Sequence, residues 1–254
     1  ALLEFIDALK KEKVECCVLI PLIPTSTVLS GELKKRKVQF ALLPFVWWAG
    51  KKTPILQRIA RTFINLLVLL PLAIKIKAWR SEVVCTNTIT VPLGALGAKI
   101  LGLPHVWFIH EFGKEDHGFT FDLGEKLSLW LVNKFSSSVA ANSHAVAEKY
   151  IKLISPAKLR VVNQPIKIKK TSFYKTERKE ESIKCAIIGR LQAEKGQEDA
   201  IRAIGALIGQ GIKAELEIIG DGSLQYQKYL SGLAEKNKIG GSVSFKSFAK
   251  TPYP

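Results

Sequence analysis

Short apolar runs alternate with segments of helical periodicity along most of the chain. Continuous apolar runs bounded by turn residues predict strands, and apolar residues that recur every three or four positions predict helices. The predicted strands are residues 15–21, 37–45, 81–87, 104–110, 136–143, 158–165, 183–188, 214–220 and 242–248. The predicted helices are residues 1–12, 54–79, 90–103, 122–135, 144–153, 196–209 and 223–237, and residues 22–37 predict a loop followed by a helix. Short apolar strands separated by helices are typical of α/β proteins with a mostly parallel sheet.

The alternation lapses once, in a polar and charged stretch at residues 167–182. A segment of this composition without periodicity predicts a linker or a surface loop. We therefore expect two domains, at residues 1–165 and 183–254, with a linker at residues 166–182. The three strands and two helices after the linker make half of a doubly wound domain.

The predicted helix at residues 54–79 contains the apolar run FINLLVLLPLAIKI, at residues 63–76. A transmembrane helix needs about 20 predominantly apolar residues. This run is shorter and is interrupted by Asn65, Pro71 and Lys75. We therefore predict a long helix packed on a sheet, while contact with a membrane surface through the basic residues on either side stays open.

Composition fits a globular protein, with 47% hydrophobic and 24% charged residues among 254. The formal net charge of +16 is large, and basic residues cluster at residues 34–37, 51–52 and 166–170. Such clusters attract nucleic acids, anionic membranes or phosphorylated substrates. No nucleic-acid-binding motif is recognisable, so we expect no nucleic acid partner. Peripheral contact with an anionic membrane remains an expectation.

The four cysteines lie at positions 16, 17, 85 and 185, without metal-binding spacing. Because three of them lie inside or beside strand-like runs, we predict buried, reduced thiols in a cytoplasmic protein.

One junction between a strand and a helix carries two cations. The strand at residues 183–188 stops at Gly189, Arg190 follows, and Lys195-Gly196 precedes the next helix. In open parallel sheets, ligands bind where strands end and the following helices begin. A helix N-terminus, a forked guanidinium and an ammonium together suit a phosphate or a diphosphate.

The string GRLQAEKGQEDAIRAI, followed by LEIIGDG, resembles the donor-site signature of GT-B-fold glycosyltransferases of family 4, of the group 1 type. The segments HVWFIHEF, VAANSHAVAEKY and KLRVVNQPI look like successive strands and helices of the same family. The resemblance spans nearly the whole chain. It implies two Rossmann-like domains, the first lacking its first strand and the second truncated.

The resemblance also implies a reaction: a hexose moves from a nucleotide sugar to an acceptor with retention of configuration, in glycan or cell-surface polysaccharide synthesis. Gly189, Arg190, Lys195 and Gly196 match the positions that bind the donor diphosphate. Charge develops there as the bond breaks, so Arg190 and Lys195 are also candidate catalytic residues. The string Gly220-Asp221-Gly222 matches positions that lie near the nucleotide in this family. The family needs no divalent metal for this step, and the sequence has no D-x-D motif.

In the first domain, His110 ends a predicted strand and matches the catalytic position that contacts the donor sugar. Glu111 and Asn163 are candidate contacts of the sugar or the acceptor, and Ser143 is a candidate helix cap. We expect no metal site, because the loop at residues 110–117 lacks the regular ligand spacing of zinc.

Three features depart from the family pattern. Lys167 lies in the region where the family often has an aspartate. The family's first strand with its glycine-rich loop, and its acidic E-x7-E pair, fall outside residues 1–254. We therefore expect this chain to be an inactive fragment of an active cytoplasmic enzyme, which lies on the inner membrane face if the basic surfaces bind lipid.

Two other classes remain as alternatives. One is a non-catalytic basic adaptor of the same fold, which binds nucleic acid or anionic membrane. The other is a nicotinamide-dependent oxidoreductase, which the absence of a G-x-G-x-x-G string disfavours.

Overall fold

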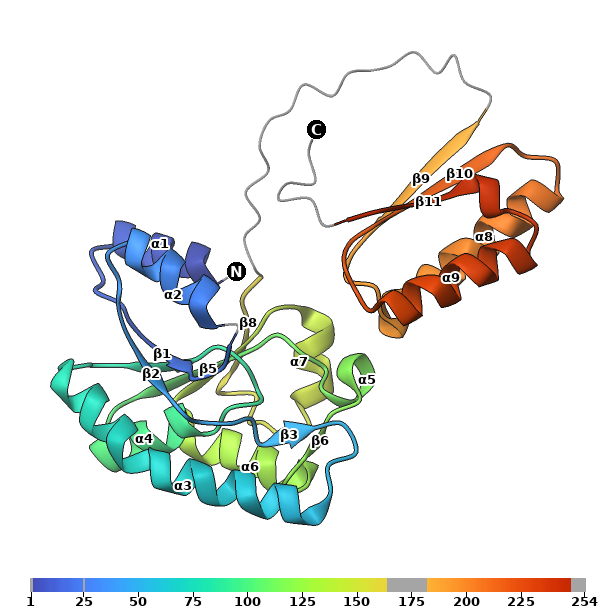
Figure 1. Cartoon of the computed structure of the whole chain (residues 1–254). Helices are drawn as coiled ribbons and strands as arrows, with labels where there is room; N and C mark the ends of the chain where they lie inside the picture. The colour runs from blue at the N-terminus through green and yellow to red at the C-terminus, as the bar shows by residue number, and fades with distance from the viewer. Residues whose placement is uncertain (1, 25, 164–181, 248–254) are drawn as a thin grey trace. The chain divides into compact units, whose positions relative to one another are not determined.

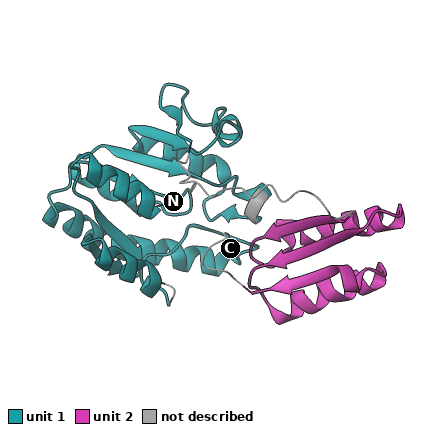
Figure 2. Ribbon diagram, turned by 90° about the horizontal axis from the view of Figure 1, so that it is seen from above, with its two compact units in different colours: residues 1–168 teal, residues 169–254 magenta. Residues whose placement is uncertain are grey.

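The computed structural model describes residues 2–24, 26–163 and 182–247, without the side chains of residues 116 and 117. The chain forms two compact units, at residues 1–168 and 169–254, shown in two colours in Figure 2. The predicted linker at residues 166–182 lies almost wholly outside the described residues, as do Lys167 and the basic cluster at residues 166–170. Each unit is described below by itself.

The first unit is built on parallel strands (Figure 1). Its four-stranded sheet has the order β4-β5-β7-β8. These strands are β4 (Val84–Thr86), β5 (His105–Ile109), β7 (Ser138–Ala141) and β8 (Leu159–Val161). A parallel pair is formed by β1 (Cys17–Pro21) and β2 (Gln39–Leu43), and an antiparallel pair by β3 (Ala49–Gly50) and β6 (Thr120–Phe121). The helices are α1 (Leu2–Lys11), α2 (Ser26–Lys35), α3 (Ile55–Ala78), α4 (Leu93–Leu101), α5 (Lys114–His117), α6 (Glu125–Phe135) and α7 (His144–Tyr150).

Helices lie on both sides of the strands of the first unit. In Figure 1, α1 and α2 lie on one side of β1 and β2, and α3 and α4 lie on the other. The alternation of side chains along β1 follows this arrangement. Ile20 packs with Ile6 of α1 and Leu33 of α2, whereas Leu19 packs with the cluster of Val68 and Leu72 from α3.

Small residues let α4 approach its neighbours closely. A Cβ at Gly94 would lie 2.2 Å from Oγ1 of Thr86 in β4. A Cβ at Gly97 would lie 2.6 Å from Cδ2 of Leu72 in α3. Both glycines are therefore packing positions, one against the sheet and one against α3.

Two polar side chains attach α3 to the unit. The amide of Asn65, which is 7% exposed, accepts a hydrogen bond from the Val46 N–H at 3.0 Å and donates one to the Val46 carbonyl at 3.0 Å. Arg61 donates to the Ala49 carbonyl at 3.2 Å and pairs with the buried carboxylate of Asp122. The inner side of α3 is therefore held by both packing and hydrogen bonds.

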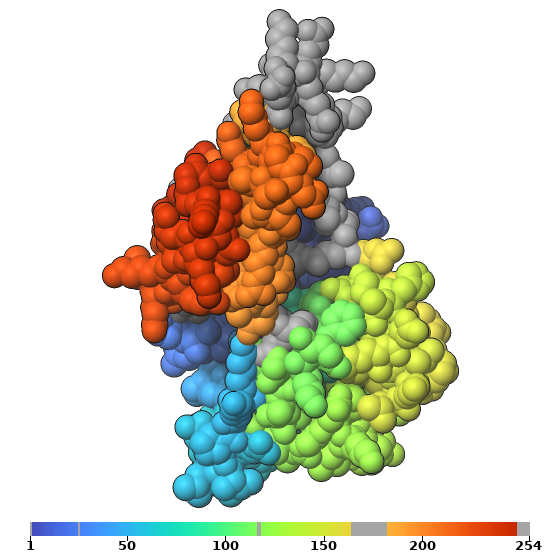
Figure 3. Space-filling view, turned by 90° about the vertical axis from the view of Figure 1, so that its right-hand side faces the viewer, coloured from blue at the N-terminus to red at the C-terminus, as the bar shows by residue number. Residues whose placement is uncertain are grey.

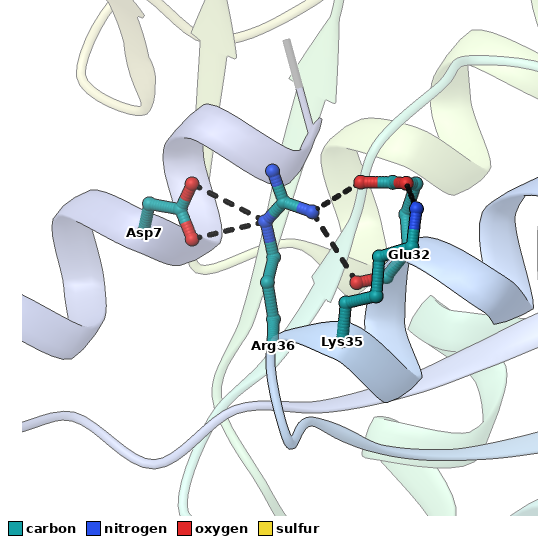
Figure 4. Close-up of polar contacts among 4 residues, drawn as sticks. All are labelled: Asp7, Glu32, Lys35 and Arg36. Carbon is teal, nitrogen blue, oxygen red and sulfur yellow. Dashed lines mark hydrogen bonds and ion pairs between the residues drawn. The ribbon is translucent and has the colours of Figure 1, made fainter.

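The basic cluster at residues 34–37 has a structural task. Nε of Arg36 lies 3.2 and 3.3 Å from the two carboxylate oxygens of Asp7, and its Nη1 lies 2.6 Å from Oε2 of Glu32 (Figure 4). Glu32 also pairs with Lys35 at 2.7 Å. Arg36 thus joins α1 to α2, and part of the cluster's charge is compensated within the unit.

The second unit is a three-stranded parallel sheet of order β11-β10-β9. Its strands are β9 (Ile183–Ile188), β10 (Ala214–Ile219) and β11 (Val243–Lys246), and its helices are α8 (Gln197–Gly209) and α9 (Leu224–Lys236). Single 3₁₀ turns occur at Ala193–Lys195 and Gly240–Ser242. Leu216 and Ile218 of β10 pack with Ile201 of α8 and Leu230 of α9 in one core. Both helices thus cover the same face of this sheet.

The prediction of buried cysteines is wrong. Cys17 and Cys85 are exposed, and Cys16 and Cys185 are half-buried. All four thiols are free, as predicted. Partial burial still raises the pKa of the thiols of Cys16, Cys17 and Cys85, so few thiolates form at neutral pH.

Candidate functional site

Two glycine-containing loops of the second unit pack against each other where β9 and β10 end. The N–H of Gly189 donates to the Ile219 carbonyl at 2.9 Å, and the N–H of Leu191 donates to the Asp221 carbonyl at 3.0 Å. Leu191 and Gly222 form a parallel bridge. The two strings singled out in the sequence, 189–191 and 220–222, therefore form one surface.

The contact between these loops requires glycine on one side. Gly220 has a φ of 147°, and a Cβ at this position would lie 2.0 Å from the Gly189 carbonyl oxygen. A Cβ at Gly222 would lie 2.5 Å from Cβ of Leu191. No side chain fits in either place, so Gly220 and Gly222 serve the packing of the loops.

Gly189 differs from these two glycines. Its φ lies outside the left-handed region, and a Cβ added there would meet nothing within 4 Å among the described residues. The backbone at this position therefore does not require glycine. Open space above a glycine at the end of a strand leaves room for close approach of a ligand.

The start of α8 is shaped by Gly196 and Gln197. Gly196 has a φ of 75°, a left-handed conformation that favours glycine. Nε2 of Gln197, a fully buried residue, donates to the Arg190 carbonyl at 3.0 Å and so closes the loop from 190 to 196. The first turn of a helix has backbone N–H groups without helical partners, and these attract anions. Glu198 and Asp199 lie in the same turn and oppose that attraction.

The carboxylate of Glu198 has hydrogen-bond partners of its own on α9. Its carboxylate accepts hydrogen bonds from the hydroxyls of Tyr226 at 3.3 Å and Tyr229 at 3.1 Å. The two tyrosine rings stack with centroids 5.8 Å apart. This group connects α8 to α9, whose N-cap Ser223 accepts from the Tyr226 N–H at 3.1 Å.

Arg190 and Lys195 are both exposed beside these loops. Neither side chain has a hydrogen bond or an ion pair with any residue that the structure describes. Two cations near the N-terminus of α8 and near the backbone of Gly189 form a surface suited to a phosphate group.

The first unit has its own row of polar residues. Asn87, His110 and Asn142 come directly after the parallel strands β4, β5 and β7, and Asn163 comes two residues after β8. The register pairs Ile109 with Ala141, so His110 and Asn142 are neighbours across the sheet edge. Carboxyl ends of parallel strands are the usual place for a ligand in such sheets.

His110 is half-buried and held by asparagines. Its Nε2 lies 2.9 Å from Oδ1 of Asn87, and its carbonyl accepts from Nδ2 of Asn142 at 3.2 Å. Because the Asn87 oxygen accepts, Nε2 carries the proton in this arrangement. Nδ1 is buried and has no partner among the described residues.

Glu111 is committed to its own unit. Oε1 accepts from the Thr88 hydroxyl at 2.9 Å, while Oε2 accepts from the N–H groups of Ile89 at 3.3 Å and His110 at 3.2 Å. These bonds attach the loop after β4 to the end of β5. Glu111 therefore has a positioning part in the site, and its oxygens have less capacity left for the sugar contact expected from the sequence.

Buried tryptophans support the same loop from inside. Nε1 of Trp107 donates to the Thr88 carbonyl at 2.6 Å, and Nε1 of Trp48 donates to the Ile89 carbonyl at 2.8 Å. Their rings stack with centroids 6.1 Å apart. Sequence reasoning missed Asn87, Asn142 and this tryptophan pair, although an asparagine directly after β4 and another directly after β7 were a usable signal.

The loop after Glu111 is held by α7. The hydroxyl of Tyr150, a buried residue, lies 3.1 Å from the Glu111 carbonyl and 3.2 Å from the Phe112 carbonyl. Lys149 contacts the Phe112 carbonyl and the Glu115 carboxylate. At the start of α7, Ser143 accepts from the Val146 N–H at 3.2 Å, which confirms its prediction as a helix cap.

The predicted site residues thus form two groups, one in each unit. His110, Glu111 and Asn163 lie in the first, and Arg190, Lys195 and the glycines lie in the second. Asn163 is exposed. No group of three or more metal-ligating side chains occurs among the described residues, a set that leaves out the side chains of Asp116 and His117.

One protein family matches part of the chain. The sequence model of the family "Glycosyl transferases group 1" matches residues 168–252. This match includes both glycine-containing loops, Arg190 and Lys195. No curated protein matches the chain in sequence.

Solved structures with the same fold cover nearly the whole chain. HepE from Anabaena, in complex with UDP and glucose, is 18% identical over 98% of this chain and 65% of its own, with a TM-score of 0.66. The lipopolysaccharide outer core galactosyltransferase WaaB is 16% identical over 93% of this chain and 69% of its own, with a TM-score of 0.58. A glycosyltransferase from Rickettsia africae is 13% identical over 93% of this chain and 69% of its own, with a TM-score of 0.61.

The chain spans 61–65% of the length of the three HepE structures. At these identities the likeness establishes the fold. The chain is an α/β protein with two Rossmann-like units of the GT-B fold, and its second unit matches the glycosyl transferases of group 1.

Proposed function

We propose that the whole protein is a glycosyltransferase that moves a hexose from a nucleotide sugar to an acceptor with retention of configuration. The observation that carries the proposal is the surface formed by the loops at 189–191 and 220–222. It combines an open glycine, a helix N-terminus and two cations without described partners.

The diphosphate of the donor is the group that fits this surface. When the bond to the sugar breaks, negative charge grows on the diphosphate. Arg190 and Lys195 stabilise that charge, and they favour the transition state because their attraction for the diphosphate strengthens as the charge develops. In this proposal the two cations take the place of a divalent metal. The open glycine at 189 lets the nucleotide lie against the backbone, and the glycines at 220 and 222 let the two loops pack together.

The polar row of the first unit takes the sugar and the acceptor. His110 faces the sugar near the reacting carbon, with its ring oriented by Asn87. Asn142 and Asn163 offer amide groups to hydroxyls. Glu111 acts indirectly, by holding the loop at 88–90 in place.

The ligands and descriptions of the similar solved structures guide the choice of the donor to test first. HepE has been solved with UDP, with UDP-glucose, and with UDP and glucose, and WaaB is described as a galactosyltransferase. UDP-hexoses are therefore the first probes for this protein, followed by GDP- and ADP-sugars. An acceptor on a lipid-linked or cell-surface polysaccharide fits the same proposal.

The test is thermal unfolding of the full-length protein with each nucleotide sugar, in the presence of a metal chelator. A ligand at 100 times its Kd stabilises the folded state by about 2.7 kcal/mol. We expect stabilisation by one class of nucleotide sugar, and its loss in Arg190→Ala. Stabilisation with no sugar transfer to any acceptor would favour the non-catalytic adaptor, and no stabilisation by any donor would reject the proposal.

A further inference from the structure

The outer side of α3 carries a continuous apolar stripe. Its members follow one another at intervals of one to four residues and are 59–76% exposed: Leu56, Ile59, Phe63, Leu66, Leu67, Leu70 and Ile74. The inner side of the same helix is buried against the unit, through Val68, Leu72 and Ile76. The helix is therefore apolar on both sides, although only one side is packed.

A surface helix normally presents polar side chains to water. Exposed apolar surface of this extent on one element marks an interaction site. Figure 3 shows the start of α3 and the turn before it (light blue) at the surface of the first unit.

Basic residues frame the stripe at both ends. Lys51 and Lys52 precede the helix, and Lys77 and Arg80 follow its last apolar turn, all four exposed. Lys75 lies 5.3 Å from the ring centroid of Trp79. An apolar centre with lysines and arginines at its rim matches a bilayer surface, where acyl chains lie beneath anionic headgroups.

The helix is long and apolar enough to cross a membrane, with 24 residues and a mean hydropathy of 1.9 in its most apolar window. The apolar run at residues 63–76 is only part of this helix. However, a crossing helix would have to leave the unit. That would expose the buried Asn65, break both of its hydrogen bonds to Val46, and separate Arg61 from Asp122. The contacts hold α3 parallel to the surface of the unit, so only its outer side is free to meet lipid.

We propose that the outer side of α3 docks onto an anionic bilayer, with the stripe in the acyl boundary and the flanking basic residues at the headgroups. The cytoplasmic leaflet supplies such a surface. The basic cluster at residues 34–37 takes no part in this contact, because α2 lies on the opposite side of the strands from α3 (Figure 1). This proposal does not depend on the sugar-transfer activity.

The test is co-sedimentation of the protein with vesicles of phosphatidylcholine, with and without phosphatidylglycerol. We expect binding that requires phosphatidylglycerol and weakens with added salt. The variant Leu67→Gln/Leu70→Gln should weaken binding about a hundredfold, because two apolar side chains no longer enter the bilayer. Leu224→Gln, which changes a leucine of the second unit that is 77% exposed, is the matched control and should bind as the parent does.

A second pair of variants tests the charges. Lys52→Gln/Lys77→Gln should weaken binding, and Lys34→Gln/Lys37→Gln, with the same loss of charge on the other side of the unit, should not. Circular dichroism verifies that each variant is folded. If both double variants weaken vesicle binding equally, binding depends only on the net charge of the protein and the proposal is overturned. Parent protein that ignores vesicles but dimerises through the stripe, with Leu67→Gln/Leu70→Gln monomeric, would also overturn it and assign the surface to a second copy.

Discussion

The carbonyl oxygen of Gly189 fills the space into which a side chain at Gly220 would project, since a Cβ there would lie 2.0 Å from it. The loops at 189–191 and 220–222 therefore touch through their backbones. Glycine is required by the fold at 220 but not at 189, where a Cβ would meet nothing within 4 Å. Gly220 is therefore needed for folding, whereas at Gly189 the lack of a side chain is expected to matter for ligand binding.

Gly220→Ala should destabilise the second unit by about 2–4 kcal/mol, because the new methyl group meets backbone and the φ of 147° strains any other residue. Gly189→Ala should leave the free energy of unfolding within about 0.5 kcal/mol of the parent. Urea unfolding measures both. Equal destabilisation by the two changes would contradict the described packing.

Gly189→Ala should nevertheless weaken nucleotide-sugar binding, by about 1–3 kcal/mol, since the methyl group would stand between the backbone and the diphosphate. Calorimetric titration of the folded variant measures the change. Unaltered affinity would mean that no ligand comes close to Gly189.

Arg190→Ala and Lys195→Ala should each lower kcat by about 10²–10³, the usual effect of losing one fixed donor at a site of developing charge. Both side chains are exposed and unpaired among the described residues, so stability should not change. Lys228→Ala on α9, another exposed lysine of this unit, is the control. Turnover at the parent level in both site variants would remove these residues from the mechanism.

His110→Gln should lower kcat by about 10- to 100-fold through misplacement at the sugar. The free energy of unfolding should stay within about 1 kcal/mol, since the side chain is only half-buried. Asn87→Ala should cause a smaller loss in kcat, because it removes the acceptor that lies 2.9 Å from Nε2 of His110. Large destabilisation with normal turnover per folded molecule would make His110 a structural residue.

Stability should fall in mild acid because of His105. This residue is buried beside Thr86, 2.8 Å from its Oγ1, and burial lowers the pKa of His105 from 6.5 to about 4. Below pH 6.5 the unfolded chain therefore binds a proton at His105, whereas the folded state keeps this ring neutral until the pH approaches 4. The free energy of unfolding is therefore unaffected above pH 6.5 and falls as the pH drops towards 4, by roughly 3 kcal/mol in total.

The NMR signal of the His105 ring, followed from pH 7 to pH 5, measures this effect directly. We expect no titration of that ring over the range. A His105 midpoint near 6.5 would contradict the buried neutral ring.

Periodicity predicts the regular elements of this chain well where apolar runs are long. The strand at 183–188 has the observed bounds. The helix at 196–209 differs from the observed helix by one residue at its start, and the helices at 54–79 and 223–237 differ by one residue at each end. The two-residue strands β3 and β6 are missed, because two residues have no period. The helix α5, with four residues, is missed for the same reason.

The site divides in the same way. Motif and position predict Arg190, Lys195 and His110 as candidate site residues, and a local pattern is enough for that prediction. The supporting contacts depend on residues far apart in the chain, such as Trp107 with Thr88 and Gln197 with the Arg190 carbonyl, and no local pattern encodes them. Burial of cysteines was inferred from hydrophobicity, which does not say how far neighbouring elements cover a strand.

The paired hydrogen bonds between Asn65 and Val46 also fix how the protein behaves in solution. Together with the Arg61 contacts and the packed apolar side chains, they stop the helix from turning about its own axis to hide its outer side. The leucines of α3 therefore remain in water whenever lipid is absent, however well the unit is folded. We therefore expect the protein to self-associate at high concentration with unchanged circular dichroism, and mild detergent to disperse it without changing the fold.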